Sequence, residues 1–131
     1  MNSQGRGSAR FNIMQVVAVL LLLCLMAVQL EYVDAATYTV GDSRGWSFKT
    51  DKWPNGKQFR AGDVLIFNYD STLHNVVAVG KGGYSSCTTP RGAKVLTSGK
   101  DRVKLARGQN YFICSFPGHC ESGMKVAINA V

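Results

Sequence analysis

The chain has 131 residues, of which 15 are Lys or Arg and 8 are Asp or Glu, so its formal net charge at pH 7 is +7. This length leaves room for one domain with an adequate hydrophobic core, once an N-terminal targeting segment is set aside. The basic residues are scattered rather than clustered, and no aromatic motif is interleaved with them, which argues against a nucleic acid as a partner.

Residues 1–35 have the pattern of a secretory signal peptide. Arg6 and Arg10 precede an apolar run from Val16 to Val28, and the small residues Ala35 and Ala36 follow it. An apolar run of 13 residues is shorter than the roughly 20 needed to span a bilayer, which disfavours a retained membrane anchor. We therefore expect cleavage after Ala35, or one residue later, and a mature protein without membrane attachment in the extracellular space, cell wall or matrix.

Residues 36–131 form the expected mature domain and retain three of the four cysteines, because Cys24 lies in the signal peptide. An odd number of cysteines in an oxidising compartment indicates one disulfide and one thiol with another use. The ordinary alternative for that thiol is a buried, inert side chain. Three pairings are open at this point: Cys87–Cys114, Cys87–Cys120 and Cys114–Cys120.

The predicted elements of the domain are short β-strands, in chain order Val64–Tyr69, Asn75–Val79, Asp101–Leu105, Asn110–Cys114 and Met124–Val131. They are rich in β-branched and aromatic residues and are separated by turn signals such as Pro117-Gly118. The segment Gly82–Cys87 is expected to form a single helical turn. The pattern predicts an all-β fold, either a small β-sandwich or a Greek-key barrel.

The segment that follows the fourth predicted strand concentrates side chains that bind soft metals. Cys114 ends that strand, His119 lies on the Pro-Gly turn, and Met124 begins the last strand. A chain that reverses direction between two strands can aim all three side chains at one point, and His74, before the second strand, is a fourth candidate. Two imidazoles, a thiolate and a weak axial thioether are the ligands of a blue copper site. We therefore predict one type 1 copper per chain.

Assigning Cys114 to the metal also resolves the cysteine count. Cys120 is then free to pair with Cys87, and this bridge closes 34 residues, worth roughly 3–4 kcal/mol on the chain-entropy model. A Cys114–Cys120 bridge would instead close a very small loop and remove the only thiolate within reach of His119. We favour the Cys87–Cys120 pairing.

The residue counts argue against an enzyme. The chain has only two histidines, fewer than multicopper oxidases and most copper oxygenases use to hold oxygen at an open position. Paired C-x₂₋₄-C spacings of structural zinc sites are absent, methionine is a poor zinc ligand, and no nucleophile elbow is present. Four protein ligands leave no vacancy for a substrate, which favours electron transfer.

The ordered set H…C…C-x₄-H-C-x₃-M is highly specific, and with it the chain resembles the phytocyanins, plant relatives of the cupredoxins, and among them the plantacyanins or basic blue proteins. The resemblance covers essentially the whole mature chain, through "TYTVGDSRGWSF", "FRAGDVLIFNY", "HNVV", "YSSCTTP" and "GQNYFICSFPGHCESGMKVAINAV". It implies a cupredoxin-like Greek-key β-sandwich of two sheets with one or two short helical turns. It also implies copper near one end and a Cys87–Cys120 disulfide. The implied copper ligands are His74, Cys114, His119 and Met124.

The expected function is that of a secreted type 1 copper protein, a monomer that transfers single electrons between a donor and an acceptor that the sequence does not identify. The alternative is an extracellular matrix-binding or signalling protein, for example in pollen–pistil guidance, in which copper is mainly structural. The positive charge favours attraction to acidic wall polysaccharides such as pectin, or docking to an acidic redox partner.

Overall fold

The computed structural model describes residues 10–30 and 34–131, and the parts of the expected signal peptide at residues 1–9 and 31–33 lie outside the described residues. The chain divides into two units, one ending at Asp34 and the other spanning Ala35–Val131. In the first unit the apolar run forms helix α1, Ile13–Leu30. Of the helices in the described ranges, none is long and apolar enough to cross a membrane. The cleavage site stays a prediction.

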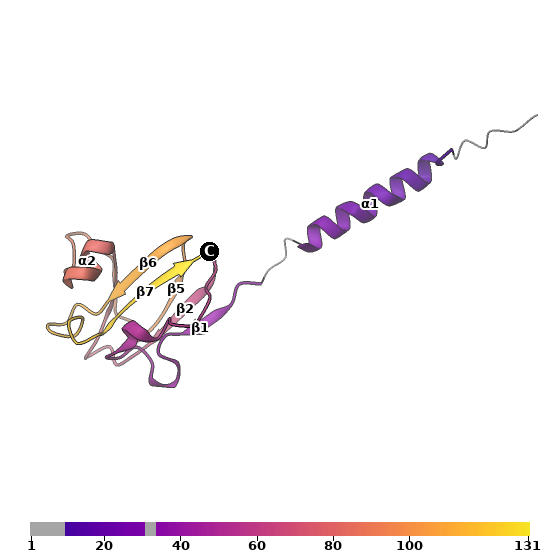
Figure 1. Cartoon of the computed structure of the whole chain (residues 1–131). Helices are drawn as coiled ribbons and strands as arrows, with labels where there is room; N and C mark the ends of the chain where they lie inside the picture. The colour runs from indigo at the N-terminus through magenta and orange to yellow at the C-terminus, as the bar shows by residue number, and fades with distance from the viewer. Residues whose placement is uncertain (1–9, 31–33) are drawn as a thin grey trace, which may run out of the picture. The chain divides into compact units, whose positions relative to one another are not determined.

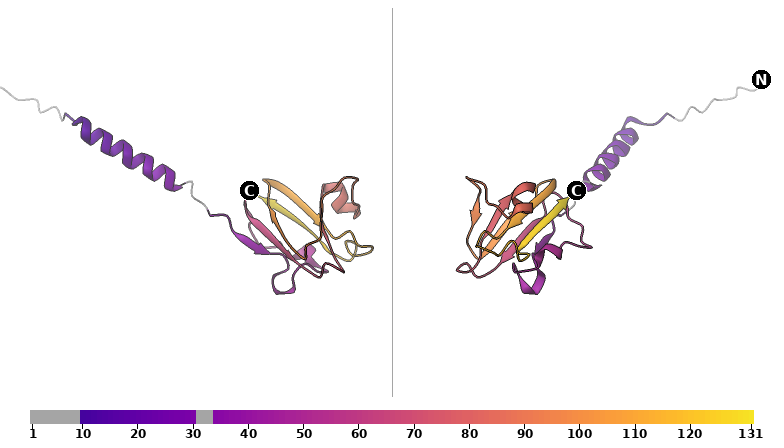
Figure 2. Two further views of the ribbon diagram at one scale, coloured as in Figure 1. Left: turned by 180° about the vertical axis from the view of Figure 1, so that it is seen from behind. Right: turned by 60° about the vertical axis from the view of Figure 1, so that its left-hand side comes forward.

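The second unit consists of two β-sheets that form two layers (Figure 1, Figure 2). One sheet has the strand order β1-β2-β5 and comprises β1 (Thr37–Thr39), β2 (Val64–Asn68) and β5 (Lys100–Lys104). The other has the order β4-β3-β6-β7 and comprises β4 (Val95–Leu96), β3 (Val76–Val79), β6 (Gly108–Ile113) and β7 (Lys125–Ala130). Adjacent strands are antiparallel except for β1 and β2. The predicted all-β fold with two sheets is confirmed.

The five strands expected from the sequence are β2, β3, β5, β6 and β7, and no bound differs from the expected one by more than two residues. The expected helical turn is α2, Lys81–Ser86. The sequence did not predict β1 or β4, because three and two residues are too few to show an alternating pattern. Two short 3₁₀ helices, η1 (Asp42–Arg44) and η2 (Thr50–Lys52), were also not predicted.

The main hydrophobic core lies between the two sheets. In β7 every second residue is buried, namely Val126, Ile128 and Ala130, as expected for a strand with one face toward a core. Phe67 of β2 is fully buried and packs against Phe112 of β6, with 5.3 Å between ring centroids. Burial of this apolar surface is the main force that fixes the strands, so the loops leave the sandwich from a rigid frame.

The outer face of the second sheet has its own small apolar cluster. Val77 of β3 and Ile113 of β6 are fully buried there, and Tyr84 of α2 packs against them together with both residues of the Cys87–Cys120 pair. The short helix α2 therefore covers this face next to the loop that joins β6 to β7, which is the loop in which the sequence places most of the metal donors.

Candidate metal centre

Two loops meet at one end of the sandwich and bring together the residues predicted to bind metal. The β2–β3 loop carries His74, and the β6–β7 loop carries Cys114, His119 and Met124. Because β3 and β6 are antiparallel neighbours, with Val77 opposite Ile113, the start of one strand lies beside the end of the other. Two loops far apart in the sequence thus converge.

Three of the predicted ligands lie within contact distance of one another. The Nδ1 atoms of His74 and His119 are 3.1 Å apart, and Cys114 Sγ lies 3.5 Å from Nδ1 of His119. One donor atom from each of the three residues lies within 4.8 Å of the other two. Three donor atoms this close together can bind a single ion.

The fourth predicted ligand, Met124, lies at the opposite end of the same loop from Cys114. The Cys114 amide donates a hydrogen bond to the Met124 carbonyl, 3.1 Å away, so the two ends of the loop are joined. Both side chains are fully buried in the main core. The sulfur donors therefore come from the protein interior, whereas His74 and His119 are only half-buried.

The β6–β7 loop is held by its own backbone. The His119 amide donates to the Phe116 carbonyl at 3.1 Å, and the Met124 amide donates to the His119 carbonyl at 3.0 Å. Gly123, which precedes Met124, has φ +89°, a backbone conformation that residues with a side chain rarely adopt. A Cβ at this position would lie 3.1 Å from the backbone nitrogen of Lys49. The turn that brings Met124 back toward Cys114 thus requires glycine.

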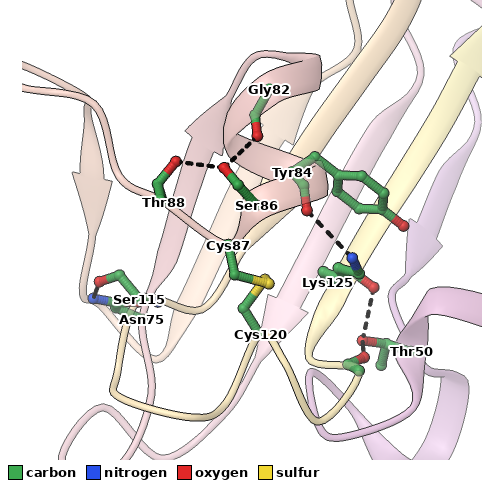
Figure 3. The surroundings of a disulfide bond; sticks show 11 residues. Thr50, Asn75, Gly82, Tyr84, Ser86, Cys87, Thr88, Ser115, Cys120 and Lys125 are labelled. Carbon is green, nitrogen blue, oxygen red and sulfur yellow. Dashed lines mark hydrogen bonds between the residues drawn. A yellow bond between two sulfur atoms is a disulfide. The ribbon is translucent and has the colours of Figure 1, made fainter.

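A disulfide joins Cys87, at the end of α2, to Cys120, next to His119 (Figure 3). The other cysteine of the domain, Cys114, is free and buried. The pairing predicted from the sequence is confirmed. A second attachment lies nearby, since Lys125 Nζ donates to the Tyr84 carbonyl at 3.2 Å and lies 4.4 Å from the centre of the Tyr84 ring. The disulfide fixes the loop directly beside one candidate donor.

Asn75 connects the two loops, a role that the sequence did not reveal. Its side-chain amide donates to Ser115 Oγ at 2.7 Å, and its Oδ1 accepts from the Ser115 amide at 2.8 Å (Figure 3). Its own carbonyl accepts a hydrogen bond from Trp46 Nε1 at 2.8 Å. Because Asn75 follows His74 and Ser115 follows Cys114, these bonds fix the distance between two candidate donors. The 40-residue separation of the partners explains why no local sequence signal marks the pair.

Aromatic rings surround the two histidines. The Phe48 ring is 5.0 Å from the His119 ring and 5.8 Å from the His74 ring, and the Phe116 ring is stacked on His119 at 5.7 Å. Burial lowers the pKa of His74, and the neighbouring His119 lowers it further, while Asp70 opposes both effects. A neutral imidazole is the form that binds metal, so this environment favours the coordinating state.

The chemistry of the donor set fits copper. Thiolate and thioether sulfur suit Cu(I), and imidazole nitrogen suits both oxidation states of copper. Zinc sites use cysteine, histidine and carboxylate ligands, so the thioether of Met124 fits copper better than zinc. The residues thus form a closed set of protein donors at one end of a rigid sandwich.

Comparisons with known proteins agree with this geometry. A family model described as a plastocyanin-like domain matches residues 43–124. The basic blue protein of Arabidopsis thaliana is 56% identical over 129 residues, which cover 98% of this chain and 99% of that protein. Chemocyanin of Lilium longiflorum is 52% identical over 129 residues, which cover 98% of each chain.

Among solved structures, the cucumber basic protein, a blue copper protein, superposes with a TM-score of 0.73 at 64% identity. The match covers 73% of this chain and all of that one. The family resemblance inferred from the ordered cysteine, histidine and methionine motif is therefore confirmed. The chain belongs to the plastocyanin-like family and, within it, to the phytocyanins of the plantacyanin, or basic blue protein, type.

Proposed function

We propose that this protein is a type 1 copper protein that transfers single electrons. His74, Cys114, His119 and Met124 would hold the copper. The observation that carries the proposal is the state of Cys114, which is buried, free and 3.5 Å from His119 Nδ1, while the other two cysteines of the domain are bonded to each other.

The chain's own residues account for fast electron exchange. When bound, copper supplies a one-electron couple between Cu(I) and Cu(II), which prefer different ligand geometries. Cys114 and Met124 are fully buried in the core, so their side chains would have little room to rearrange when the bound metal gains or loses an electron. The half-buried rings of His74 and His119, beside the partly exposed Phe48, form the edge through which electrons leave. With four protein donors no position is open for a substrate, and the protein is an electron carrier rather than an enzyme.

The test is a titration of the purified, metal-free protein with Cu(II), followed by visible absorption. We expect one equivalent to produce an intense band from charge transfer between the Cys114 thiolate and copper. Cys114→Ser should show no such band when Cu(II) is added. The matched control Cys87→Ser/Cys120→Ser, which removes two other sulfurs, should keep the band. Absence of the band in the unmodified protein would refute the copper proposal, as would a band that persists in Cys114→Ser.

We also propose that the domain acts outside the cell after cleavage following Ala35. The Ala36 amide now donates to Asp63 Oδ1 at 2.9 Å, and Asp63 is only 3% exposed. Cleavage of the peptide bond between Ala35 and Ala36 converts the Ala36 nitrogen into a positively charged amine next to the buried Asp63 carboxylate. Cleavage one residue later removes Ala36, and with it the hydrogen-bond donor to Asp63. The match to the solved cucumber protein covers all of that chain and 73% of this one. The 96 residues that follow Ala35 are the same share of the 131-residue chain. N-terminal sequencing of protein from the culture medium should begin at Ala36; Thr37 would contradict the site.

A second function is supported by the positive charge of the chain, which favours attraction to acidic extracellular polymers. In that case the domain acts as an extracellular signalling or matrix-binding protein, and copper mainly stabilises it. Cys114→Ser separates the two functions, provided that circular dichroism shows that the variant is folded. Loss of biological activity in a folded variant supports electron transfer, and full retention supports the signalling role.

A further inference from the structure

An open groove lies where the two sheets end on the same side of the domain. β4 is an edge strand of one sheet and β5 is an edge strand of the other, and they are consecutive in the chain. Between these edges lies a cavity of about 280 Å³, whose lining includes Ala78, Lys94, Leu96, Arg102, Lys104 and Phe112. None of the proposed copper ligands lines this cavity, which we call the cationic groove.

The cationic groove combines an apolar floor with a positively charged rim. Phe112 is only 3% exposed and Leu96 is half-buried, whereas the three basic side chains are exposed. No carboxylate is among the described residues that line the groove. The neighbouring Asp101 is not among the lining residues; it is buried, and its carboxylate accepts hydrogen bonds from Tyr69 and Ser98. The positive charges therefore face solvent without an acidic neighbour in the groove.

We propose that the cationic groove binds a linear polyuronate, a glycan that carries one carboxylate on each sugar ring. Carboxylates form charge-assisted hydrogen bonds with guanidinium and ammonium groups, and the apolar C–H faces of a sugar ring can pack on Leu96 and Phe112. This inference rests on the proposed secretion, because such polymers lie outside the cell, but it does not depend on copper.

The size of the groove favours a glycan over an acidic protein. Its volume of about 280 Å³ is just below the range for small-ligand pockets, roughly 300–1,000 Å³. That space accommodates one or two rings of a polymer, with further rings outside it. A stable protein partner, in contrast, covers about 800 Å² of surface on each side, far more than the groove provides.

The competing explanation is that these charges protect exposed sheet edges. Charged side chains on edge strands, lysine above all, prevent two copies of a protein from pairing edge to edge. That explanation predicts that neutralising the charges leaves polyuronate binding unchanged and instead causes self-association, which size-exclusion chromatography detects.

The experiment compares two triple variants of the copper-loaded protein, purified from the culture medium, for binding to immobilised polygalacturonate. The groove variant is Lys94→Gln/Arg102→Gln/Lys104→Gln. The control variant is Lys52→Gln/Arg60→Gln/Lys81→Gln, which removes the same charge from exposed residues outside the groove. We expect the groove variant to lose affinity by at least about tenfold and the control by less than about threefold, because only the former loses direct ion pairs.

A third variant tests the shape of the groove without a change of charge. Ala78 is exposed and lines the groove, so Ala78→Phe should fill it and weaken binding to polygalacturonate. Fully methyl-esterified polymer, which has no carboxylates, should not bind. Equal losses in the two triple variants would overturn the proposal, because binding would then depend on overall charge. Equally tight, groove-dependent binding of polyglutamate would overturn the assignment to a glycan.

The failure of this proposal is distinguishable from failure of the proposed function. A secreted, blue protein that does not bind polygalacturonate contradicts the groove alone. A colourless protein that binds it through the groove contradicts the copper proposal alone. Absence of the processed protein from the medium contradicts the secretion on which the polyuronate assignment rests, and so overturns that assignment too.

Discussion

The two loops that supply the metal donors are held in place by different means. The β6–β7 loop contributes three donors and is fixed by backbone hydrogen bonds between its own residues and by the Cys87–Cys120 disulfide. The β2–β3 loop contributes only His74. The His74 amide donates to the Asp70 carbonyl within the loop, and side-chain hydrogen bonds from Tyr69 and Asn75 hold its two ends, but no disulfide does. The difference between the loops is therefore covalent: one has a disulfide, and the other relies on hydrogen bonds and on the packing of Tyr69 against the main core.

The first prediction removes the covalent anchor of the β6–β7 loop. Cys87→Ser/Cys120→Ser should lower the free energy of unfolding by roughly 3–4 kcal/mol, because the bridge spans a sequence separation of 33 residues and restricts the unfolded chain. Urea unfolding of the metal-free protein measures the effect. A loss below about 1 kcal/mol would mean that backbone hydrogen bonds alone fix this loop, and the contrast between the loops would disappear.

The second prediction breaks the link between the loops. Asn75→Ala removes two hydrogen bonds to Ser115 from a residue that is 8% exposed, so we expect a loss of about 2 kcal/mol and weaker copper binding. Ser115→Ala is the matched control, because it keeps the backbone amide of Ser115 and removes only the hydroxyl. Urea unfolding of both single variants and of the double variant forms a cycle. Strictly additive losses would contradict a direct coupling between the two loops.

The third prediction concerns the start of the β2–β3 loop and has the smallest effect. The Tyr69 hydroxyl donates to the Asp101 carboxylate and lies 3.1 Å from the Leu96 carbonyl, so Tyr69→Phe should lower stability by about 1 kcal/mol at neutral pH. Burial first, and then the hydrogen bond to Asp101, raise the pKa of Tyr69 from 10.0 to about 12. Because the folded state disfavours the phenolate, this contribution is complete below pH 10 and is lost as the pH rises from 10 to 12.

The measurement for Tyr69 is urea unfolding at several pH values on both sides of 10. The unmodified protein should lose stability faster than Tyr69→Phe above this pH, so the difference between the two proteins should shrink or reverse. A constant difference across the range would show that Tyr69 ionises equally well in the folded and unfolded states, and that its hydroxyl is not a protected anchor.

Much of the candidate site could be predicted from the sequence because its signals are local. Cys114, His119, Cys120 and Met124 lie within eleven consecutive residues between two apolar strands. A chain that must reverse direction there has few ways to place these side chains. The strands themselves were predictable because buried and exposed residues alternate along them, as in β7.

The arrangement of the edges was not predictable in the same way. β1 pairs in parallel with β2 although about 25 residues separate them, and β4 consists of two residues. The cationic groove depends on β4 and β5 lying at the edges of different sheets. In the sequence, Lys94, Arg102 and Lys104 cannot be distinguished from the other basic residues scattered along the chain.

The residues that carry the chemistry can be recognised from the sequence: one thiol, two imidazoles and one thioether at a spacing typical of a blue copper site, and two cysteines left for a bridge. The folded domain, in contrast, is needed to bring His74 to the other donors, through Asn75 and Ser115, and to place three charges in one groove. Donor type and local spacing are written along the chain, whereas contacts between residues 40 positions apart exist only after the sheets have packed.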